Sequence, residues 1–417
     1  MRKLVTAFLA LCMRIFYRRI ELAGTERIPD GPVIFAMNHP NGLVDPLFLV
    51  CFAPRPVSFL AKAPLFRYPV ISFFVHLFDS IPVYRKQDHN TRGSNEETFS
   101  RARDVLRRGG AIAIFPEGTT HDDAQLRELK TGAARIALGA RLEAMSVVPV
   151  GIYYTAKHVF RSSALVVFGE PLTVASSDES PGAVEQLTAE IDAGLDAVTL
   201  QADSRAALAL VARAEDIFSA TDALPLPAEF GLQRRFVDGY RYLATHDPAR
   251  LARLETAVTQ FEAELRRAGV DVQNLVHRGG AARAFRVIVL LPLALLGAIV
   301  SYPTYRLIGV LAKRFSGGED AVVATIKLLA ALALYPLTYL AIAYLVGMRF
   351  GVPTGLVVLL VLPFLAYLAL RVFEDIDEVL ADARAFAHRD DRARLLQQRE
   401  AIRNEFVAVA EEMAARR

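Results

Sequence analysis

A hydrophobic region near the C-terminal end, residues 285–372, constrains the fold more than any other feature of the chain. Residues 322–346 and 352–370 are each long enough to cross a bilayer, which takes about 20 residues of α-helix. Gly347 and Gly351 lie in the short loop between them, so these two segments are expected to form a helical hairpin. The sequence therefore predicts an integral membrane protein.

A third hydrophobic segment, residues 287–303, is shorter and is interrupted by Pro292, so it is expected either to span the membrane or to be re-entrant. Three basic residues follow it: Arg306, Lys313 and Arg314. The hairpin loop carries only Arg349. Basic loops favour the cytoplasmic side of a membrane. If this basic loop and the N-terminal domain both lie on that side, the third segment must be re-entrant or interfacial. Three true spans would instead place the basic loop outside.

Residues 20–175 alternate strand-like and helix-like segments. Buried strands are predicted at residues 32–36, 111–115, 146–154 and 165–168, and helices at residues 97–108 and 133–140. This alternation predicts an α/β catalytic domain with a mainly parallel sheet flanked by helices.

The remaining segments have helical patterns. Residues 1–19 combine a basic start with the apolar run Leu4–Cys12 but lack a small-residue cleavage site, which favours an uncleaved amphipathic helix on the membrane. The apolar spacing in residues 178–280 predicts a helical region that packs on the catalytic domain, with helices over 183–218 and 250–267. Residues 374–417 predict a charged, solvated helical tail.

Composition limits the partners. The chain has 48 basic and 45 acidic residues, a net charge of +3 and no long basic run, so no nucleic-acid partner is expected. The lipid bilayer is the expected partner of the hydrophobic region. The two cysteines, Cys12 and Cys51, cannot form a disulfide framework.

The strongest chemical signal is the stretch Asn38–Pro46, which follows the first predicted strand. His39 can act as a general base near neutral pH, and Asp45 can fix the tautomer of its imidazole. Five residues separate the two, so a bent loop must bring them together. From residue types alone, a hydrogen-bonded loop histidine is an equally good interpretation.

Two further stretches carry polar residues at strand ends. Arg85 ends the run Ile81–Arg85 and can hold a phosphate through paired hydrogen bonds; a surface ion pair is the alternative. Glu117, Gly118 and Thr119 follow the strand at 111–115. Lys130 precedes a predicted helix, where an anion site is plausible, although an ordinary solvated lysine fits equally.

Taken together, these stretches resemble the glycerolipid acyltransferase family, which contains the 1-acylglycerol-3-phosphate acyltransferases. The matching segments are Asn38–Asp45, Ile81–Arg85, Phe115–Thr119 and Val148–Val150. Ala324–Leu328 and Tyr335–Pro336 are similar, more loosely, to a branch with fungal-type glycerol-3-phosphate and dihydroxyacetone-phosphate acyltransferases.

The resemblance implies direct acyl transfer from acyl-CoA or acyl-carrier protein to 1-acyl-sn-glycerol-3-phosphate or glycerol-3-phosphate, with no cofactor and no metal. It implies that His39 and Asp45 are catalytic. It assigns acceptor binding to a second set of residues, which comprises Arg85, Glu117, Gly118, Thr119 and Lys130. It also implies phospholipid biosynthesis, with the catalytic domain on the cytoplasmic face.

Two departures from the family pattern bear on the site. The family usually has four residues between the histidine and the aspartate, where this chain has five. The family often has an arginine after the threonine of its third segment, where Thr120 stands here. Three alternatives stay open: an acyltransferase for dihydroxyacetone phosphate, a non-catalytic membrane scaffold, and a hydrolase or metalloenzyme that uses His39 and Asp45. For the last of these, a conceivable metal cluster comprises Glu117, His121, Asp122 and Asp123.

Overall fold

The computed structural model describes residues 1–84, 95–175, 179–220, 224–276, 281–387 and 389–416. The chain forms two compact units. The first comprises Met1–Ser204 together with Gly318–Thr325, and the second comprises Arg205–Gly317 and Ile326–Arg417.

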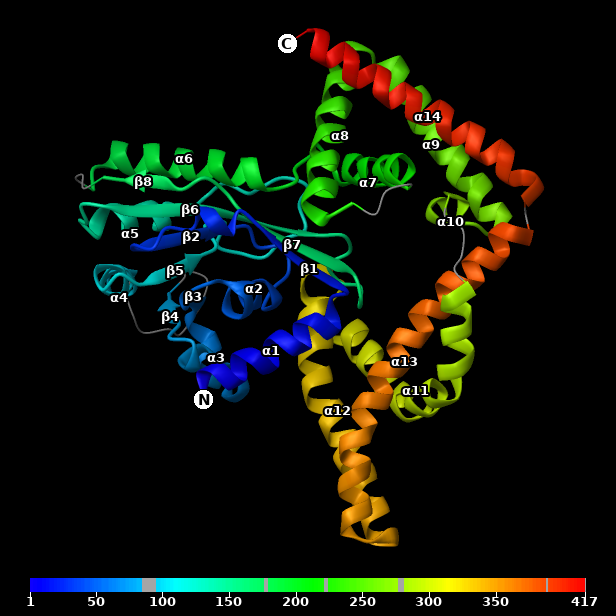
Figure 1. Ribbon diagram of the computed structural model, residues 1–417. Helices are drawn as coiled ribbons and strands as arrows, with labels where there is room; N and C mark the ends of the chain where they lie inside the picture. Colours follow the sequence, from blue (N-terminus) through cyan, green and yellow to red (C-terminus); the bar gives the residue numbers. More distant parts are fainter. Residues whose placement is uncertain (85–94, 176–178, 221–223, 277–280, 388, 417) are drawn as a thin grey trace. The chain divides into compact units, whose positions relative to one another are not determined.

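An eight-stranded sheet forms the centre of the first unit (Figure 1). Its strands are β1 (Arg19–Ala23), β2 (Val33–Met37), β3 (Val57–Lys62), β4 (Ile81–Val83), β5 (Ala111–Ile114), β6 (Met145–Tyr154), β7 (Ser163–Phe168) and β8 (Leu172–Val174). Their order is β1-β7-β6-β2-β5-β3-β4, with β8 also paired to β6. Only the β6–β7 and β6–β8 pairs are antiparallel among the described ladders. The prediction of a mainly parallel α/β domain is therefore confirmed.

Helices flank this sheet. They are α1 (Arg2–Phe16), α2 (Val44–Phe52), α3 (Pro69–Leu77), α4 (Asn95–Arg107), α5 (Gly132–Gly139) and α6 (Pro181–Val198), with 3-10 turns η1 (Thr25–Arg27) and η2 (Ala63–Arg67). Ile34 and Ile112 of the sheet share one core with Leu106 of α4, Ile136 of α5 and Leu195 of α6. Because α6 completes this core, the first unit continues past residue 175 to Ser204, and the helix predicted over 183–218 is interrupted after Val198.

Helix α1 has two apolar faces. Leu9, Met13 and Phe16 are buried, whereas Leu4, Phe8 and Leu11 are exposed. The neighbouring segment at α3 also exposes Tyr68, Val70 and Phe73. Arg2 of α1 bonds Asp79, just after α3, at 2.5 Å. These exposed side chains agree with the amphipathic pattern, and the membrane role of residues 1–19 stays a prediction.

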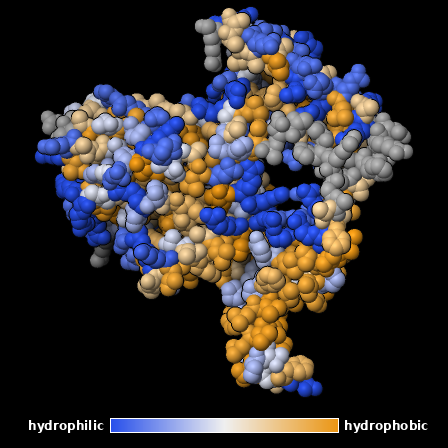
Figure 2. Space-filling view, in the orientation of Figure 1, coloured by the Kyte–Doolittle hydropathy of each residue, from blue (hydrophilic) through white to orange (hydrophobic). Residues whose placement is uncertain are grey.

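The second unit is helical. Its helices are α7 (Arg205–Ser219), α8 (Leu226–His246), α9 (Pro248–Ala268), α10 (Val272–Val276), α11 (Ala281–Phe315), α12 (Asp320–Phe350), α13 (Val352–Ala387) and α14 (Arg389–Ala415), and the first residues of α12 belong to the first unit. Three helical segments are long and apolar enough to cross a membrane: Ala282–Phe315, Asp320–Phe350 and Val352–Leu380. Hydrophobic side chains cover these helices in Figure 2. The short segment at 287–303 is thus part of one long continuous helix, and Gly351, with φ +93°, makes the hairpin turn.

The tail is not a solvated helix, contrary to the sequence-based expectation. Leu395, Ile402 and Val409 of α14 are buried, and Leu395 and Ile402 share a core with Val258 and Phe261 of α9. These apolar residues recur every seven positions, so they lie on one face of the helix. The many charged residues on the other faces obscured this stripe in the sequence.

Candidate active site

The candidate site lies where three adjacent parallel strands end. β2 pairs in parallel with both β5 and β6, so the carboxyl ends of all three meet at one edge of the sheet. Loops at such an edge commonly form binding sites in α/β folds. His39 follows β2, Glu117 follows β5, and Tyr154 is the last residue of β6.

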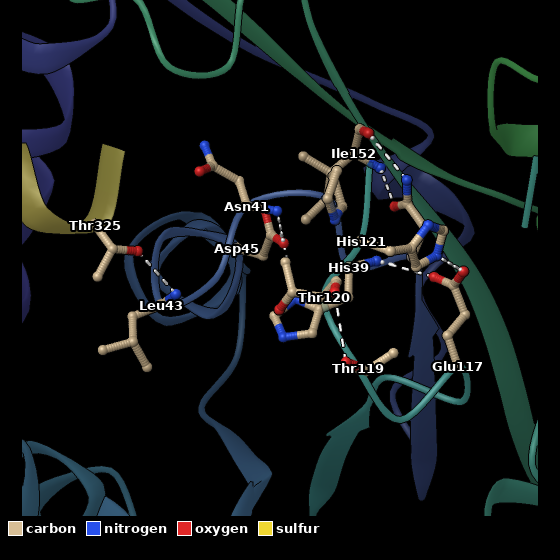
Figure 3. Close-up of polar contacts among 12 residues, drawn as sticks. His39, Asn41, Leu43, Asp45, Glu117, Thr119, Thr120, His121, Ile152 and Thr325 are labelled. Carbon is tan, nitrogen blue, oxygen red and sulfur yellow. Dashed lines mark hydrogen bonds and ion pairs between the residues drawn. The ribbon is translucent and has the colours of Figure 1, made fainter. Parts of the chain in front are cut away.

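The structure brings His39 and Asp45 into contact (Figure 3). Nδ1 of His39 lies 2.8 Å from Oδ2 of Asp45, which is in the first turn of α2. The imidazole stacks on Phe115, with ring centroids 3.9 Å apart. The His39 side chain is 17% exposed, and its Nε2 bonds none of the residues that the structure describes. One ring nitrogen is therefore held by the protein and the other is open to a substrate.

Asp45 is fully buried and accepts hydrogen bonds from more than His39. The backbone N–H of Asn41 donates to Oδ2 at 2.7 Å, and the Tyr154 hydroxyl donates to Oδ1 at 2.5 Å. Burial, and next the negative charge of Asp45, raise the pKa of Tyr154 well above its usual value, so this hydroxyl stays a donor. A carboxylate with these partners accepts the proton of Nδ1–H, which leaves the lone pair on Nε2.

A second group of contacts fixes the loop between His39 and Asp45. The buried side chain of Asn41 donates through Nδ2 to the Tyr17 hydroxyl and to the carbonyl of Lys157, both at 3.1 Å. Nζ of Lys157 donates to the carbonyl of Pro40 at 3.0 Å and pairs with Asp122. The loop is thus tied to the residue after α1, to the loop after β6 and to the loop after β5.

Glu117 joins the loops that follow β2 and β5. Its side chain is almost fully buried; Oε1 accepts the backbone N–H of His39 at 3.2 Å, and Oε2 accepts the backbone N–H of Arg127 at 3.0 Å. Oε2 also pairs with the ring of His121. Across the described part of the chain, no three His, Cys, Asp or Glu side chains form a group that could hold a metal ion. The structure places Glu117 next to His39, while its predicted contact with an acceptor stays a prediction.

The other predicted binding residues lie beside Glu117, with one exception. Gly118 has φ +71°, and a side chain there would collide with the ammonium end of Lys130. Lys130 is exposed and directly precedes the start of α5. The Thr119 hydroxyl donates to the carbonyl of Thr120 at 3.4 Å. Arg85 lies in 85–94, outside the described residues.

Sequence reasoning missed three groups at this site: Tyr17, Tyr154 and Thr325. The Thr325 hydroxyl accepts the backbone N–H of Leu43 at 3.1 Å, across 282 positions of the chain. The position of Tyr154 at a predicted strand end was a usable signal. Thr325 lies in the matching segment Ala324–Leu328, but that resemblance gave it no role at this site, and no local pattern marks Tyr17. Both contacts depend on the tertiary fold.

Two family models match the chain. Residues 19–153 match the family described as "Acyltransferase", and residues 216–415 match "Glycerol-3-phosphate acyltransferase 2 C-terminal domain". The first match covers the loops described above, and the second covers most of the helical unit.

Curated relatives agree with these models. The chain is 26% identical over 448 residues to glycerol-3-phosphate O-acyltransferase 1 of Saccharomyces cerevisiae, covering 78% of this chain and 58% of that protein. It is 32% identical over 225 residues to glycerol-3-phosphate O-acyltransferase 2 of the same yeast, covering 50% of this chain and 30% of that protein. The similarity to a 1-acyl-sn-glycerol-3-phosphate acyltransferase of Borreliella burgdorferi is 28% over 156 residues, 37% of this chain and 58% of that protein. The chain thus spans less than two thirds of the length of each of these relatives.

A solved structure, that of a 1-acyl-sn-glycerophosphate acyltransferase from Thermotoga maritima, matches 47% of this chain and 80% of its own. The sequence identity is 20% and the TM-score is 0.36. A similarity of this size carries no argument about the site.

Proposed function

We propose that the chain, which matches an acyltransferase model and a glycerol-3-phosphate acyltransferase 2 C-terminal model, is a glycerolipid O-acyltransferase that moves a fatty acyl group from a thioester to a glycerol-phosphate acceptor. One observation carries the proposal. Asp45 holds Nδ1 of His39 at 2.8 Å, and Nε2 bonds none of the described residues. This is the arrangement that a general base requires.

The proposed reaction is direct transfer. Nε2 of His39 takes the proton of the acceptor hydroxyl as the oxygen attacks the thioester carbonyl carbon. The tetrahedral intermediate collapses, the carbon–sulfur bond breaks, and the leaving thiolate takes the proton back from the imidazolium. Asp45 stabilises the positive charge that develops on His39 during the attack. A thioester is already activated, so this scheme needs no enzyme nucleophile.

We assign acceptor binding to the residues that the family resemblance indicates. Arg85 and Lys130 would bind the acceptor phosphate, and Gly118 and Thr119 would shape the site. Glu117 would act partly through the loop, because its carboxylate accepts the N–H of His39. The acyl donor would be acyl-CoA or acyl-carrier protein, with no cofactor.

Glycerol-3-phosphate is the acceptor that we propose first. The C-terminal match is to a domain of glycerol-3-phosphate acyltransferase 2, and the match to the yeast glycerol-3-phosphate enzyme 1 covers 78% of the chain. The 1-acyl-sn-glycerol-3-phosphate acyltransferase of Borreliella burgdorferi matches only 37% of the chain. 1-Acyl-sn-glycerol-3-phosphate and dihydroxyacetone phosphate are the second choices.

We further propose that the catalytic unit lies on the cytoplasmic face of a membrane. Three helices with the length and composition of membrane spans support a membrane protein. Their orientation is an inference from the positive-inside rule: Lys313 and Arg314 directly precede Gly318–Thr325 of the catalytic unit, so a cytoplasmic catalytic unit requires α11 to be re-entrant or interfacial. Tagging the N-terminus and the 316–319 loop for protease protection would test it.

The test of function is acyl transfer by the purified full chain in lipid vesicles. Labelled acyl-CoA or acyl-carrier protein would be offered with each of the three acceptors, using wild type, His39→Ala and His246→Ala. His246 is a suitable control because it is an exposed histidine of α8. We expect His39→Ala to lose about 10²- to 10⁴-fold in kcat, the usual contribution of a general base, and His246→Ala to match wild type.

The outcomes separate the alternatives. Transfer that persists in His39→Ala contradicts the mechanism. Transfer to none of the three acceptors, under conditions in which a known acyltransferase works, favours a non-catalytic scaffold. The acceptor with the highest kcat/KM identifies the substrate.

A further inference from the structure

The loop that carries the catalytic pair touches the start of helix α12. Leu43 donates its backbone N–H to the Thr325 hydroxyl at 3.1 Å (Figure 3). Gly42 lies against Ala321 and Thr325. Gly318–Thr325 belong to the same compact unit as the catalytic sheet. Thr325 is 8% exposed, so this contact is largely shielded from water.

The contact lies where the loop becomes a helix. Leu43 is the N-cap residue of α2, and its own side chain accepts no hydrogen bond from the helix. Asp45 follows two residues later, in the first turn. The Thr325 hydroxyl therefore provides an acceptor from outside the loop at the residue that precedes the first turn of α2, which carries Asp45. A partly buried N–H without an acceptor would destabilise this arrangement.

The close approach also explains how the loop accommodates five residues between His39 and Asp45. Gly42 adopts φ +47°, a conformation that glycine reaches without strain. A side chain at this position would come within 2.9 Å of the Thr325 hydroxyl and 3.1 Å of the Ala321 carbonyl. The loop conformation that brings Asp45 to His39 is thus the one that fits against the first turns of α12.

We propose that Thr325 is a positioning residue for the His39–Asp45 pair. The proposal rests on the proposed function, and it adds that a residue of a hydrophobic C-terminal helix sets the geometry of the general base. Thr325 touches no reacting atom. It acts through the N–H of Leu43, and misplacement of a catalytic group by about 1 Å is enough to slow a reaction severely.

Two substitutions separate the hydroxyl from the rest of the side chain. Thr325→Val keeps the shape and removes the hydrogen bond, whereas Thr325→Ser keeps the hydroxyl. Thr304→Val is the matched control, because Thr304 is also buried in a hydrophobic helix and its hydroxyl bonds Thr338 at 2.8 Å. Each variant would be measured for kcat, for KM of both substrates, and for hydrogen exchange of the peptide covering residues 40–48.

We expect Thr325→Val to lose about five- to tenfold in kcat, the factor that one hydrogen bond contributes, with each KM within about twofold of wild type. Thr325→Ser should recover most of the loss, and Thr304→Val should match wild type. Exchange in residues 40–48 should accelerate in Thr325→Val alone. A role in stability only would lower the melting temperature without this selective loss of kcat.

Wild-type kcat in Thr325→Val, an equal loss in Thr325→Ser, or unchanged exchange would overturn the proposal. The exchange measurement does not depend on turnover. If wild type transfers no acyl group, the proposed function fails, and with it the catalytic consequence of the contact, while faster exchange would still support Thr325 as the tether of the loop.

Discussion

Replacing Asp45 by Asn tests whether the charge of this residue, and not only its shape, supports the reaction. The amide oxygen can occupy the place of Oδ2 and accept the bonds from His39 and Asn41, which are 2.8 and 2.7 Å long in the native protein. The amide nitrogen then faces the Tyr154 hydroxyl, which can turn to accept its hydrogen bond. The geometry of the pair should therefore survive while the negative charge is lost.

The expected loss follows from the distance between the two charges. Unit charges about 4 Å apart near a protein surface attract by about 4 kcal/mol. The imidazolium that forms during the attack would lose this stabilisation, which corresponds to about 10³-fold in kcat. The substrates bind before this charge develops, so each KM should stay within a few-fold of wild type.

The assay is steady-state transfer in vesicles together with thermal unfolding. Tyr154→Phe is the control, because it removes one donor from the same carboxylate and keeps the charge; it should cost about tenfold or less in kcat. In Asp45→Asn the Tyr154 O–H loses its acceptor, which should lower the free energy of unfolding by about 1–3 kcal/mol. Combining the two substitutions should recover none of the loss in kcat, because the negative charge stays absent.

An Asp45→Asn variant that keeps more than about a tenth of wild-type kcat would refute this reasoning, because the charge would then contribute little. A KM that rises as steeply as kcat falls would also refute it, since it would indicate a binding role.

Two further predictions concern single positions. Gly42→Ala should lower the free energy of unfolding by about 1–3 kcal/mol, because φ is +47° and the new methyl group would crowd the Thr325 hydroxyl. Thermal unfolding would measure this change. An unchanged unfolding midpoint would contradict the described loop. Burial, then the like charges of Glu215 and Glu262, raise the pKa of Asp216 to about 6 in the folded protein, so its charged form opposes folding above that pH. Asp216→Asn should stabilise the chain above pH 6 by less than about 1 kcal/mol, because part of the Asp216 side chain is open to solvent, which screens the repulsion. The gain should disappear below about pH 4, where Asp216 is protonated in both the folded and the unfolded state. A gain that does not depend on pH would contradict the assignment.

The sequence predicted the parts of the site that depend on local order. The strand before His39 and the strand before Glu117 were both recognised, and parallel pairing of β2 and β5 places the two loops side by side. The contact between His39 and Asp45 was expected from the residue types and a family resemblance, not from geometry, because a loop of five intervening residues has no regular geometry.

The remaining contacts could not be predicted because they join distant segments. Tyr154 reaches Asp45 across 109 positions, and Thr325 reaches Leu43 across 282. Nothing in the residues around Thr325 distinguishes a hydroxyl that holds a loop from one that bonds its own helix, as Thr338 does. The alternating charges of α14 similarly concealed the buried stripe that includes Leu395 and Ile402.

The exposed apolar side chains of α1 and α3 suggest which substrate concentration should determine the rate of the proposed reaction. Leu4, Phe8 and Leu11, with Val70 and Phe73, are exposed, and we expect them to give the catalytic unit its own affinity for an interface. An acyl chain also partitions into the bilayer, so both reactants would meet in two dimensions. We then expect the rate to follow the mole fraction of acyl donor in the surface. Diluting the vesicles with inert lipid should slow turnover even at a fixed bulk concentration of substrate.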